Sequence, residues 1–139
     1  MTRPLFWRIT ALTAIAVVLS GCAAAHPPAY AELASPQGDA DTYAPGLPEN
    51  LNESSVRFVG EHDGRSYYLA QSSSGTAGDS VCILVDAPDV DSSAGCGNNE
   101  VTVTWSAGAA QYNASPVPES AMQDDWVRIS DNLIFRPKS

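Results

Sequence analysis

The chain is short and acidic: its 139 residues include 16 Asp or Glu against 7 Lys or Arg, for a formal net charge of −9 at pH 7. This surplus of acid argues against nucleic acid as a partner and against electrostatic docking on anionic lipid. It fits a cationic partner, or an acidity that serves only solubility near a membrane and implies no partner. The length allows a single domain with a modest core.

The first 21 residues have the layout of an export signal. Arg3 and Arg8 give a basic start, and residues 9–19 form an apolar run that is too short to span a bilayer. The run ends in Leu19-Ser20-Gly21-Cys22, which resembles the lipobox of bacterial lipoproteins at every position. The resemblance implies cleavage before Cys22 and a diacylglyceryl group on the Cys22 thiol.

Two acyl chains would hold the protein stably on the extracytoplasmic side of the cell membrane, because each buried methylene contributes about 0.8 kcal/mol. Removal of residues 1–21 takes away two Arg and no acid, so the formal net charge becomes −11. The alternative is a secreted protein with a chance cysteine near an ordinary cleavage site.

Residues 22–53 are predicted to be a disordered tether that starts at the lipidated Cys22. The segment is rich in Ala, Pro and acidic residues, and its prolines recur without hydrophobic periodicity. A flexible chain of about 30 residues has a span of about 30 Å, which would hold the folded part away from the membrane. No chemistry is assigned to Tyr30 or Tyr43 in this segment.

From residue 54 to residue 139 the pattern changes to period two, which is typical of strands. Asp63-Gly64 between two apolar runs predicts a β-hairpin in which Phe58 faces Leu69 and Val59 faces Tyr68. Further strands are predicted at residues 81–85, 101–105, 126–129 and 133–135, and a short helical turn within residues 119–125.

These elements predict an all-β fold. We expect one small antiparallel β-sandwich or half-open barrel over residues 54–139. Three cysteines are an awkward number for an exported protein, and with Cys22 assigned to lipid, Cys82 and Cys96 remain to form one disulfide. Such a loop closure is worth about 3 kcal/mol on the chain-entropy estimate. The alternative is a reduced pair in metal or redox chemistry, which lacks a CxxC spacing.

Several short blocks of the predicted domain resemble a recurring type of small lipoprotein from actinobacteria. The blocks are residues 59–64, 68–70, 81–85, 95–97 and 130–132. The resemblance implies one domain with paired cysteines and implies no activity.

The acidic loop of residues 86–93 is the best candidate for metal chemistry. Counted from Asp89, it overlaps the oxygen-ligand spacing of an EF-hand calcium loop, with Asp91, Ser93 and Glu100 at positions 3, 5 and 12. Ala94 stands where the turn needs Gly. We therefore expect a solvated loop and no cofactor, with a calcium site of another geometry at Asp86, Asp89 and Asp91 as the alternative.

His62 is the only histidine of the predicted domain, and it lies beside the predicted turn. A Ser-His-Asp hydrolase would have to use it, but no serine is singled out as a nucleophile. We expect a solvated histidine and no enzymatic activity. The alternative is a cell-wall-acting hydrolase with a cleft lined by His62 and a carboxylate.

Aromatic residues offer a binding surface. Tyr67 and Tyr68 are adjacent on a strand and point to opposite faces, so one of them is exposed unless both faces are covered. Together with Tyr112, Trp105 and Trp126 they would make a platform for a glycan or a protein. The competing interpretation places these rings in the core.

The sequence as a whole predicts a non-enzymatic, membrane-anchored envelope lipoprotein. Its β-domain would bind a cationic protein or a cell-wall partner, or serve a structural role. One alternative is an inhibitor of a cationic cell-wall enzyme such as lysozyme, suggested by small size, acidity and tethering.

Overall fold

The computed structural model describes residues 30–72, 80–88 and 93–138. The described residues form an all-β fold, as predicted, with two short 3₁₀ helices, η1 (Glu32–Ala34) and η2 (Glu119–Ala121). The strands are β1 (Leu51–His62), β2 (Arg65–Ser72), β3 (Val81–Asp86), β4 (Ser93–Gly97), β5 (Glu100–Trp105), β6 (Gly108–Asn113), β7 (Val127–Arg128) and β8 (Leu133–Pro137). None of the helices in these ranges is long and apolar enough to span a bilayer.

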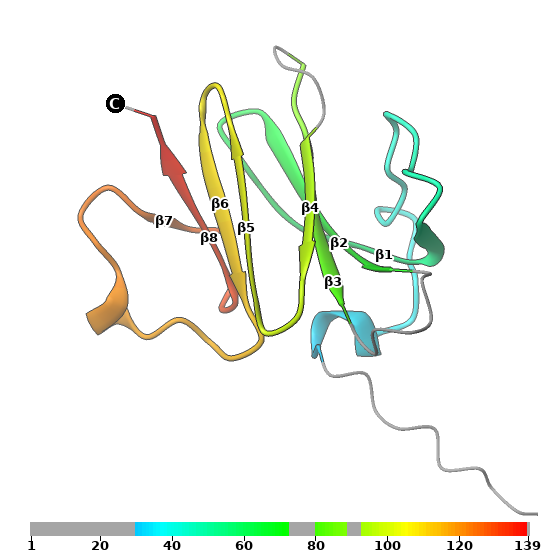
Figure 1. The fold of residues 1–139 in the computed structure, drawn as a ribbon, viewed down its shortest axis with the longest axis horizontal. Coiled ribbons are helices and arrows are strands. Elements are labelled where there is room, and N and C mark those ends of the chain that lie inside the picture. Colours follow the sequence, from blue (N-terminus) through cyan, green and yellow to red (C-terminus); the bar gives the residue numbers. More distant parts are fainter. Residues whose placement is uncertain (1–29, 73–79, 89–92, 139) are drawn as a thin grey trace, which may run out of the picture.

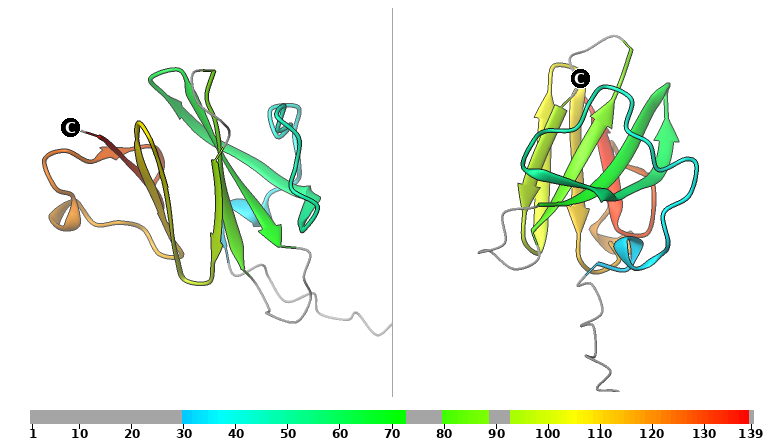
Figure 2. Two further views of the ribbon diagram at one scale, coloured as in Figure 1. Left: turned by 45° about the horizontal axis from the view of Figure 1, so that its top comes forward. Right: turned by 90° about the vertical axis from the view of Figure 1, so that its right-hand side faces the viewer.

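The strands make two antiparallel sheets of four strands, which pack face to face as a sandwich (Figure 1). The first sheet has the order β1-β2-β3-β4 and the second has the order β5-β6-β8-β7. Residues 98 and 99 connect β4 to β5, so these two edge strands lie side by side where the chain passes from one sheet to the other (Figure 2).

Two glycines allow the sheets to approach each other at both edges. A Cβ on Gly95 of β4 would lie 2.7 Å from Val103 Cγ2 of β5. A Cβ on Gly60 of β1 would lie 2.8 Å from Cγ2 of Ile129, which follows β7. A side chain does not fit at such distances, so the close approach of the two sheets at each edge of the sandwich depends on glycine.

The turn between β1 and β2 is the predicted one. Asp63 has φ 52° and Gly64 has φ 72°, the left-handed conformations that a two-residue hairpin turn requires. The pairing near the turn follows directly, with Gly60 opposite Tyr67.

The predicted register is wrong beyond a bulge at Val59. Phe58 faces Tyr68, and Arg57 faces Leu69, one residue away from the prediction. The extra residue is accommodated where β1 bends past Ile129 at the edge of the sandwich, and an alternating sequence pattern carries no signal for such a bulge.

The inner faces of the two sheets form the main core. Its buried residues are Tyr67, Leu69, Val81, Ile83 and Val85 from the first sheet, Val101, Val103, Ala110, Tyr112, Leu133 and Phe135 from the second sheet, and Tyr30 from the segment before them. The alternation predicted for residues 101–105 is confirmed, because Val101 and Val103 are buried, whereas Thr102 and Thr104 are exposed.

The outer face of the first sheet is also covered. A second buried cluster on this face contains Tyr68, Ala70, Cys82 and Leu84, with Leu51 and Val56 from β1. Tyr43 and Leu47 from the segment before β1 pack against it. The strands β2 and β3 are therefore buried on both faces.

The predicted tether is wrong for residues 30–53, because these residues belong to the folded domain. Tyr30 is only 2% exposed in the main core, and its hydroxyl donates a 2.6 Å hydrogen bond to Asn98 O. The segment is irregular, so the few large side chains that it buries follow no period. Residues 22–29, including Cys22, lie outside the described residues.

The predicted disulfide is confirmed. Cys82 of β3 and Cys96 of β4 face each other directly in the strand pair, with a Cα–Cα distance of 4.0 Å and an S–S bond of 2.06 Å. The bond lies on the outer face of the first sheet, where Cys82 is buried and Cys96 is exposed.

Candidate functional site

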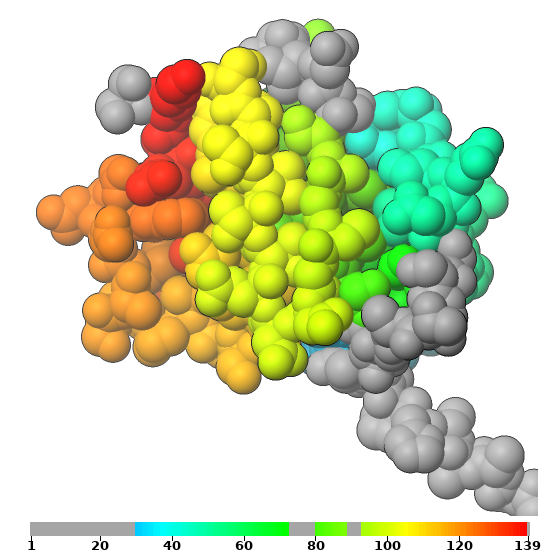
Figure 3. Space-filling view, in the orientation of Figure 1, coloured from blue at the N-terminus to red at the C-terminus, as the bar shows by residue number. Residues whose placement is uncertain are grey.

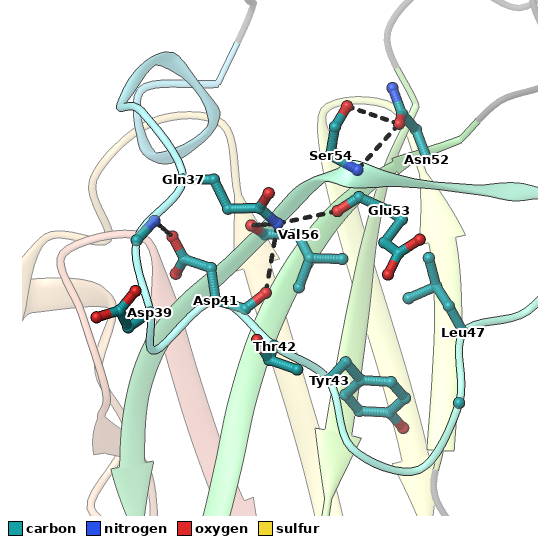
Figure 4. Close-up of a pocket in the computed structure, with 12 residues that line it drawn as sticks. Gln37, Asp39, Asp41, Thr42, Tyr43, Leu47, Asn52, Glu53, Ser54 and Val56 are labelled. Atoms are coloured by element: carbon teal, nitrogen blue, oxygen red, sulfur yellow. Dashed lines mark hydrogen bonds between the residues drawn. The ribbon is translucent and has the colours of Figure 1, made fainter.

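A groove of about 840 Å³ lies on the outer face of the first sheet, between residues 37–47 and the first part of β1 (Figure 4). We call it the acidic groove; residues 37–39, 41–43, 46–47, 52–54 and 56 line it. Its two walls come from parts of the chain whose local structure differs, and each wall is fixed by its own hydrogen bonds.

One wall is a large irregularity in β1. Between Asn52 and Arg57, β1 has more residues than the part of β2 that it faces, so the extra residues bulge out of the sheet. Asn52 Oδ1 accepts hydrogen bonds from the Ser54 amide at 3.1 Å and the Ser54 hydroxyl at 2.8 Å. The Ser55 hydroxyl donates to Asn52 O at 2.6 Å. The bulge places Glu53 in the groove wall.

The other wall is held by Gln37 and Asp41. Gln37 Nε2 donates to Glu53 O at 3.0 Å, which ties this wall to the bulge. Asp41 Oδ2 accepts from the Gly38 amide at 2.7 Å, and Asp41 Oδ1 accepts from the Phe58 amide at 2.6 Å. Both carboxylate oxygens of Asp41 thus bind the backbone, which gives this acid a structural role.

The charged side chains that line the acidic groove are the carboxylates of Asp39, Asp41 and Glu53. The Arg57 guanidinium lies next to the lining, where it donates to Ser54 O at 2.9 Å and to Val56 O at 2.7 Å. Asp39 and Glu53 are exposed. In Figure 4 the Glu53 carboxylate lies beside Leu47, and Asp39 lies toward the other end of the groove, beyond Asp41. Two acids are therefore available to a ligand at separate places.

The lining of the acidic groove also includes the apolar side chains of Tyr43, Leu47 and Val56, and further aromatic rings lie next to Tyr43. The Tyr43 ring packs edge-on against Tyr68 at 5.5 Å between centroids, and Phe58 packs edge-on against the same ring at 5.5 Å. Phe58 is 37% exposed and is the exposed large hydrophobic residue of the described chain. An apolar stem with a cationic head, as in Lys or Arg, fits such a surface.

The interpretation that places Tyr67, Tyr68 and Tyr112 in the core is confirmed, and these three rings form no exposed platform. Tyr67 and Tyr112 are 0% exposed and Tyr68 is 8% exposed, because the second sheet covers one face of the first sheet and residues 43–47 cover the other. Burial raises the pKa of Tyr67 to about 12. Burial, and next the hydrogen bond to Glu32, raise the pKa of Tyr112 well above its usual range. Trp105 and Trp126, the other two candidates for the platform, are half-buried.

The EF-hand spacing counted from Asp89 is not realised. Positions 5 to 9 of the counted loop are the extended strand β4, which begins at Ser93, and Glu100 at position 12 begins β5. For the alternative calcium site, Asp86 ends β3, and Asp89 and Asp91 lie outside the described residues. No group of three or more His, Cys, Asp or Glu that could hold a metal ion is found within residues 30–72, 80–88 and 93–138.

His62 ends β1 and is half-buried rather than solvated at the turn. Its ring lies 5.7 Å from the Phe135 ring between centroids. Its strand partner Arg65 is buried and forms a 3.0 Å ion pair with Asp63. His62 does not line the acidic groove. The hydrolase alternative stays an untested prediction.

Sequence reasoning missed the acidic groove because it assigned Gln37, Asp39 and Asp41 to a tether. The available signal was the pair Tyr43 and Leu47, which are the only large apolar residues in the sequence of residues 35–50. Comparison with known proteins adds no assignment: no protein-family model, curated protein or solved structure matches the chain significantly.

Proposed function

We propose that this chain is a non-enzymatic, membrane-anchored envelope lipoprotein whose domain binds a cationic protein in the acidic groove. The observation that carries the proposal is a groove of about 840 Å³ whose charged lining side chains are all carboxylates. The formal net charge, which is −9 for the whole chain and −11 after removal of residues 1–21, adds a negative field that accelerates the encounter with a cationic partner.

Asp39 and Glu53 are the recognition groups in this proposal. The Asp41 carboxylate accepts hydrogen bonds from the Gly38 and Phe58 amides, so a ligand could bind it only if these two hydrogen bonds broke. A Lys or Arg side chain of the partner would lay its stem on the apolar lining beside Tyr43 and direct its charge to Asp39 or Glu53. The hydrogen bond from Gln37 Nε2 to Glu53 O holds the backbone of the two walls together before binding, which lowers the conformational entropy lost on complex formation.

The anchor in the proposal is Cys22, on the strength of the lipobox. Because Tyr30 is already in the core, only residues 23–29 separate it from the lipid. Even fully extended, such a segment spans no more than about 25 Å. Figure 1 shows η1 below the sandwich and the β1–β2 turn at its upper end, so the η1 end would face the membrane.

The test uses lysozyme as a cationic probe and the detergent-solubilised native protein. The variant Asp39→Asn/Glu53→Gln removes both recognition charges and should weaken binding about tenfold. The matched control is Asp124→Asn/Asp125→Asn, which changes the same number of charges at exposed residues outside the groove. Equal losses of lysozyme affinity in the two double variants would contradict binding in the acidic groove.

The same samples separate the alternatives. Loss of lysozyme activity in the complex would specify the protein as an inhibitor. Hydrolysis of peptidoglycan by the protein alone, abolished in His62→Ala, would replace the proposal with an enzyme.

A further inference from the structure

A second groove, of about 420 Å³, lies over the outer face of the second sheet, between β6, β8 and the segment that connects β6 to β7. It is on the opposite side of the molecule from the acidic groove. Figure 3 shows the two segments that build the grooves, residues 37–50 at the right edge and residues 114–126 at the left edge. We call this site the amide groove.

Three side-chain amides and one indole face the amide groove. Gln111 and Asn113 alternate along β6, so both point to the outer face, and Gln111 Nε2 donates to Asn113 Oδ1 at 3.5 Å. Gln123 and Trp126 come from the connecting segment. Ile134, which faces Gln111 in the β6–β8 pair and is buried, completes the lining on the sheet side.

The residues that line the amide groove are uncharged, and the charges of its wall, Arg128 and Glu119, are paired with each other. None of the described residues that line it is Asp, Glu, Lys or Arg, although 17% of the chain is charged. A charged ligand would lose its hydration there without gaining a counter-charge, which is unfavourable. The absence of charge therefore selects a neutral ligand, in contrast to the acidic groove.

The wall of the amide groove is fixed before any ligand binds. Arg128 Nη2 donates to Val117 O at 2.7 Å and to Glu119 Oε1 at 2.9 Å, and the Val117 amide donates to Asp131 O at 2.8 Å. The guanidinium of Arg136 lies over the Trp126 ring, 5.2 Å from its centroid. These contacts hold the wall and the indole in place, which lowers the entropic cost of binding.

We propose that the amide groove binds a segment of a neutral polysaccharide. Each amide offers both a donor and an acceptor, which matches pairs of sugar hydroxyls that also do both. Arg136 covers one face of the half-buried Trp126 indole, and the other face would take the C–H surface of a sugar ring.

A peptide strand fits the amide groove less well. Peptides that bind sheets add to an edge strand, but β6 and β8 are the interior strands of the second sheet. Pro116 and Pro118 in the wall have no amide hydrogen to offer. A backbone ligand would therefore find few partners.

The experiment follows indole N–H signals by NMR in detergent, with Trp126 as the reporter and Trp105 as the internal reference. Trp7, the third Trp of the sequence, is lost on cleavage before Cys22. The probes are neutral tetrasaccharides built from hexose, pentose or N-acetylhexosamine units, the corresponding monosaccharides, a tetragalacturonate and an uncharged tetrapeptide. At least one neutral tetrasaccharide should shift the Trp126 signal and leave Trp105 in place. A larger shift of the Trp126 signal with a tetrasaccharide than with its monosaccharide supports a polysaccharide as the ligand. A larger shift with the monosaccharide would overturn the proposal of a polysaccharide site.

The variants test whether the amides carry the binding. Gln123→Ala removes an exposed side chain and should weaken binding by the effective tetrasaccharide about three- to tenfold. Gln71→Ala is the matched control, because Gln71 lies on β2 and lines neither groove. The proposal is overturned if no neutral tetrasaccharide shifts Trp126, if only the charged sugar or the peptide does so, or if the two variants behave alike. None of these results depends on the acidic groove.

Discussion

The hydroxyl of Tyr112 in β6 donates a 2.7 Å hydrogen bond to Glu32 Oε2 in η1, across 80 positions of the sequence. The ring of Tyr30 packs edge-on against the same tyrosine, with the centroids 5.8 Å apart. The segment before β1 thus closes one end of the main core, and the domain depends on residues that composition alone assigns to a tether.

Tyr30→Ala should therefore destabilise the domain by about 3–5 kcal/mol, the usual cost of truncating a buried aromatic side chain. Urea denaturation of the native and variant proteins measures the change. Tyr30→Phe is the control, since it keeps the buried ring and removes the hydroxyl that donates to Asn98 O, which should cost about 1 kcal/mol. A loss below about 0.5 kcal/mol in Tyr30→Ala would show that the segment does not contribute to the fold.

Much of the sheet structure could be predicted from the sequence, because β3, β5 and β8 contain branched or aromatic residues with clear burial patterns. The strands β4 and β6 were missed. Their sequences, SAGCG and GAAQYN, contain small residues that have little strand preference. These strands form because β3 pairs with β4 and β8 pairs with β6. At Gly95 of β4, in addition, only glycine fits against Val103 of β5.

The grooves could not be predicted, since each is built by irregular backbone. The acidic groove needs the bulge after Asn52 and the contacts of Tyr43 and Leu47 with a distant sheet face. The amide groove needs the path of residues 114–126 across β6 and β8. Periodicity describes regular elements and has no signal for such paths.

The two buried tyrosines predict a loss of stability at alkaline pH. Burial raises the pKa of Tyr67 to about 12, and it raises the pKa of Tyr112 further above its usual range. In the unfolded chain both groups titrate near pH 10. Above that pH the folded state retains protons that the unfolded state has lost. The free energy of unfolding should thus be fully maintained below about pH 10 and then fall, by up to about 1.4 kcal/mol per pH unit for each tyrosine.

Urea denaturation between pH 8 and pH 12 measures this slope, and Tyr67→Phe tests its assignment. No described residue accepts a hydrogen bond from the Tyr67 hydroxyl, so the substitution should cost little at neutral pH. Its share of the slope between pH 10 and 12 should disappear. An unchanged slope in the variant would assign the effect to other groups.

The disulfide should make a large contribution to stability. Cys82→Ala/Cys96→Ala is expected to lower the free energy of unfolding by about 2–4 kcal/mol, because it frees the loop between β3 and β4 in the unfolded state. Peptide mapping after thiol blocking should find the two cysteines joined in the exported protein. Recovery of both thiols in the free form would refute this prediction.

The lipobox predicts hydrophobic attachment through Cys22. The native protein should stay in the membrane fraction after a high-salt wash, because salt screens charges and leaves acyl chains in the bilayer. Cys22→Ser removes the acceptor of the lipid and should abolish labelling by a radioactive fatty acid. Labelling that persists in Cys22→Ser would place the lipid on another residue.

The most direct test of the account is the kinetics of lysozyme binding as a function of salt. The Debye length falls from about 30 Å at 0.01 M salt to about 10 Å at 0.1 M, so the association rate constant should fall over this range for the native protein. Asp39→Asn/Glu53→Gln should dissociate about tenfold faster than the native protein, whereas Asp124→Asn/Asp125→Asn should keep the native dissociation rate. Equal dissociation rates for the two double variants, or no binding at 0.01 M salt, would contradict a recognition site in the acidic groove.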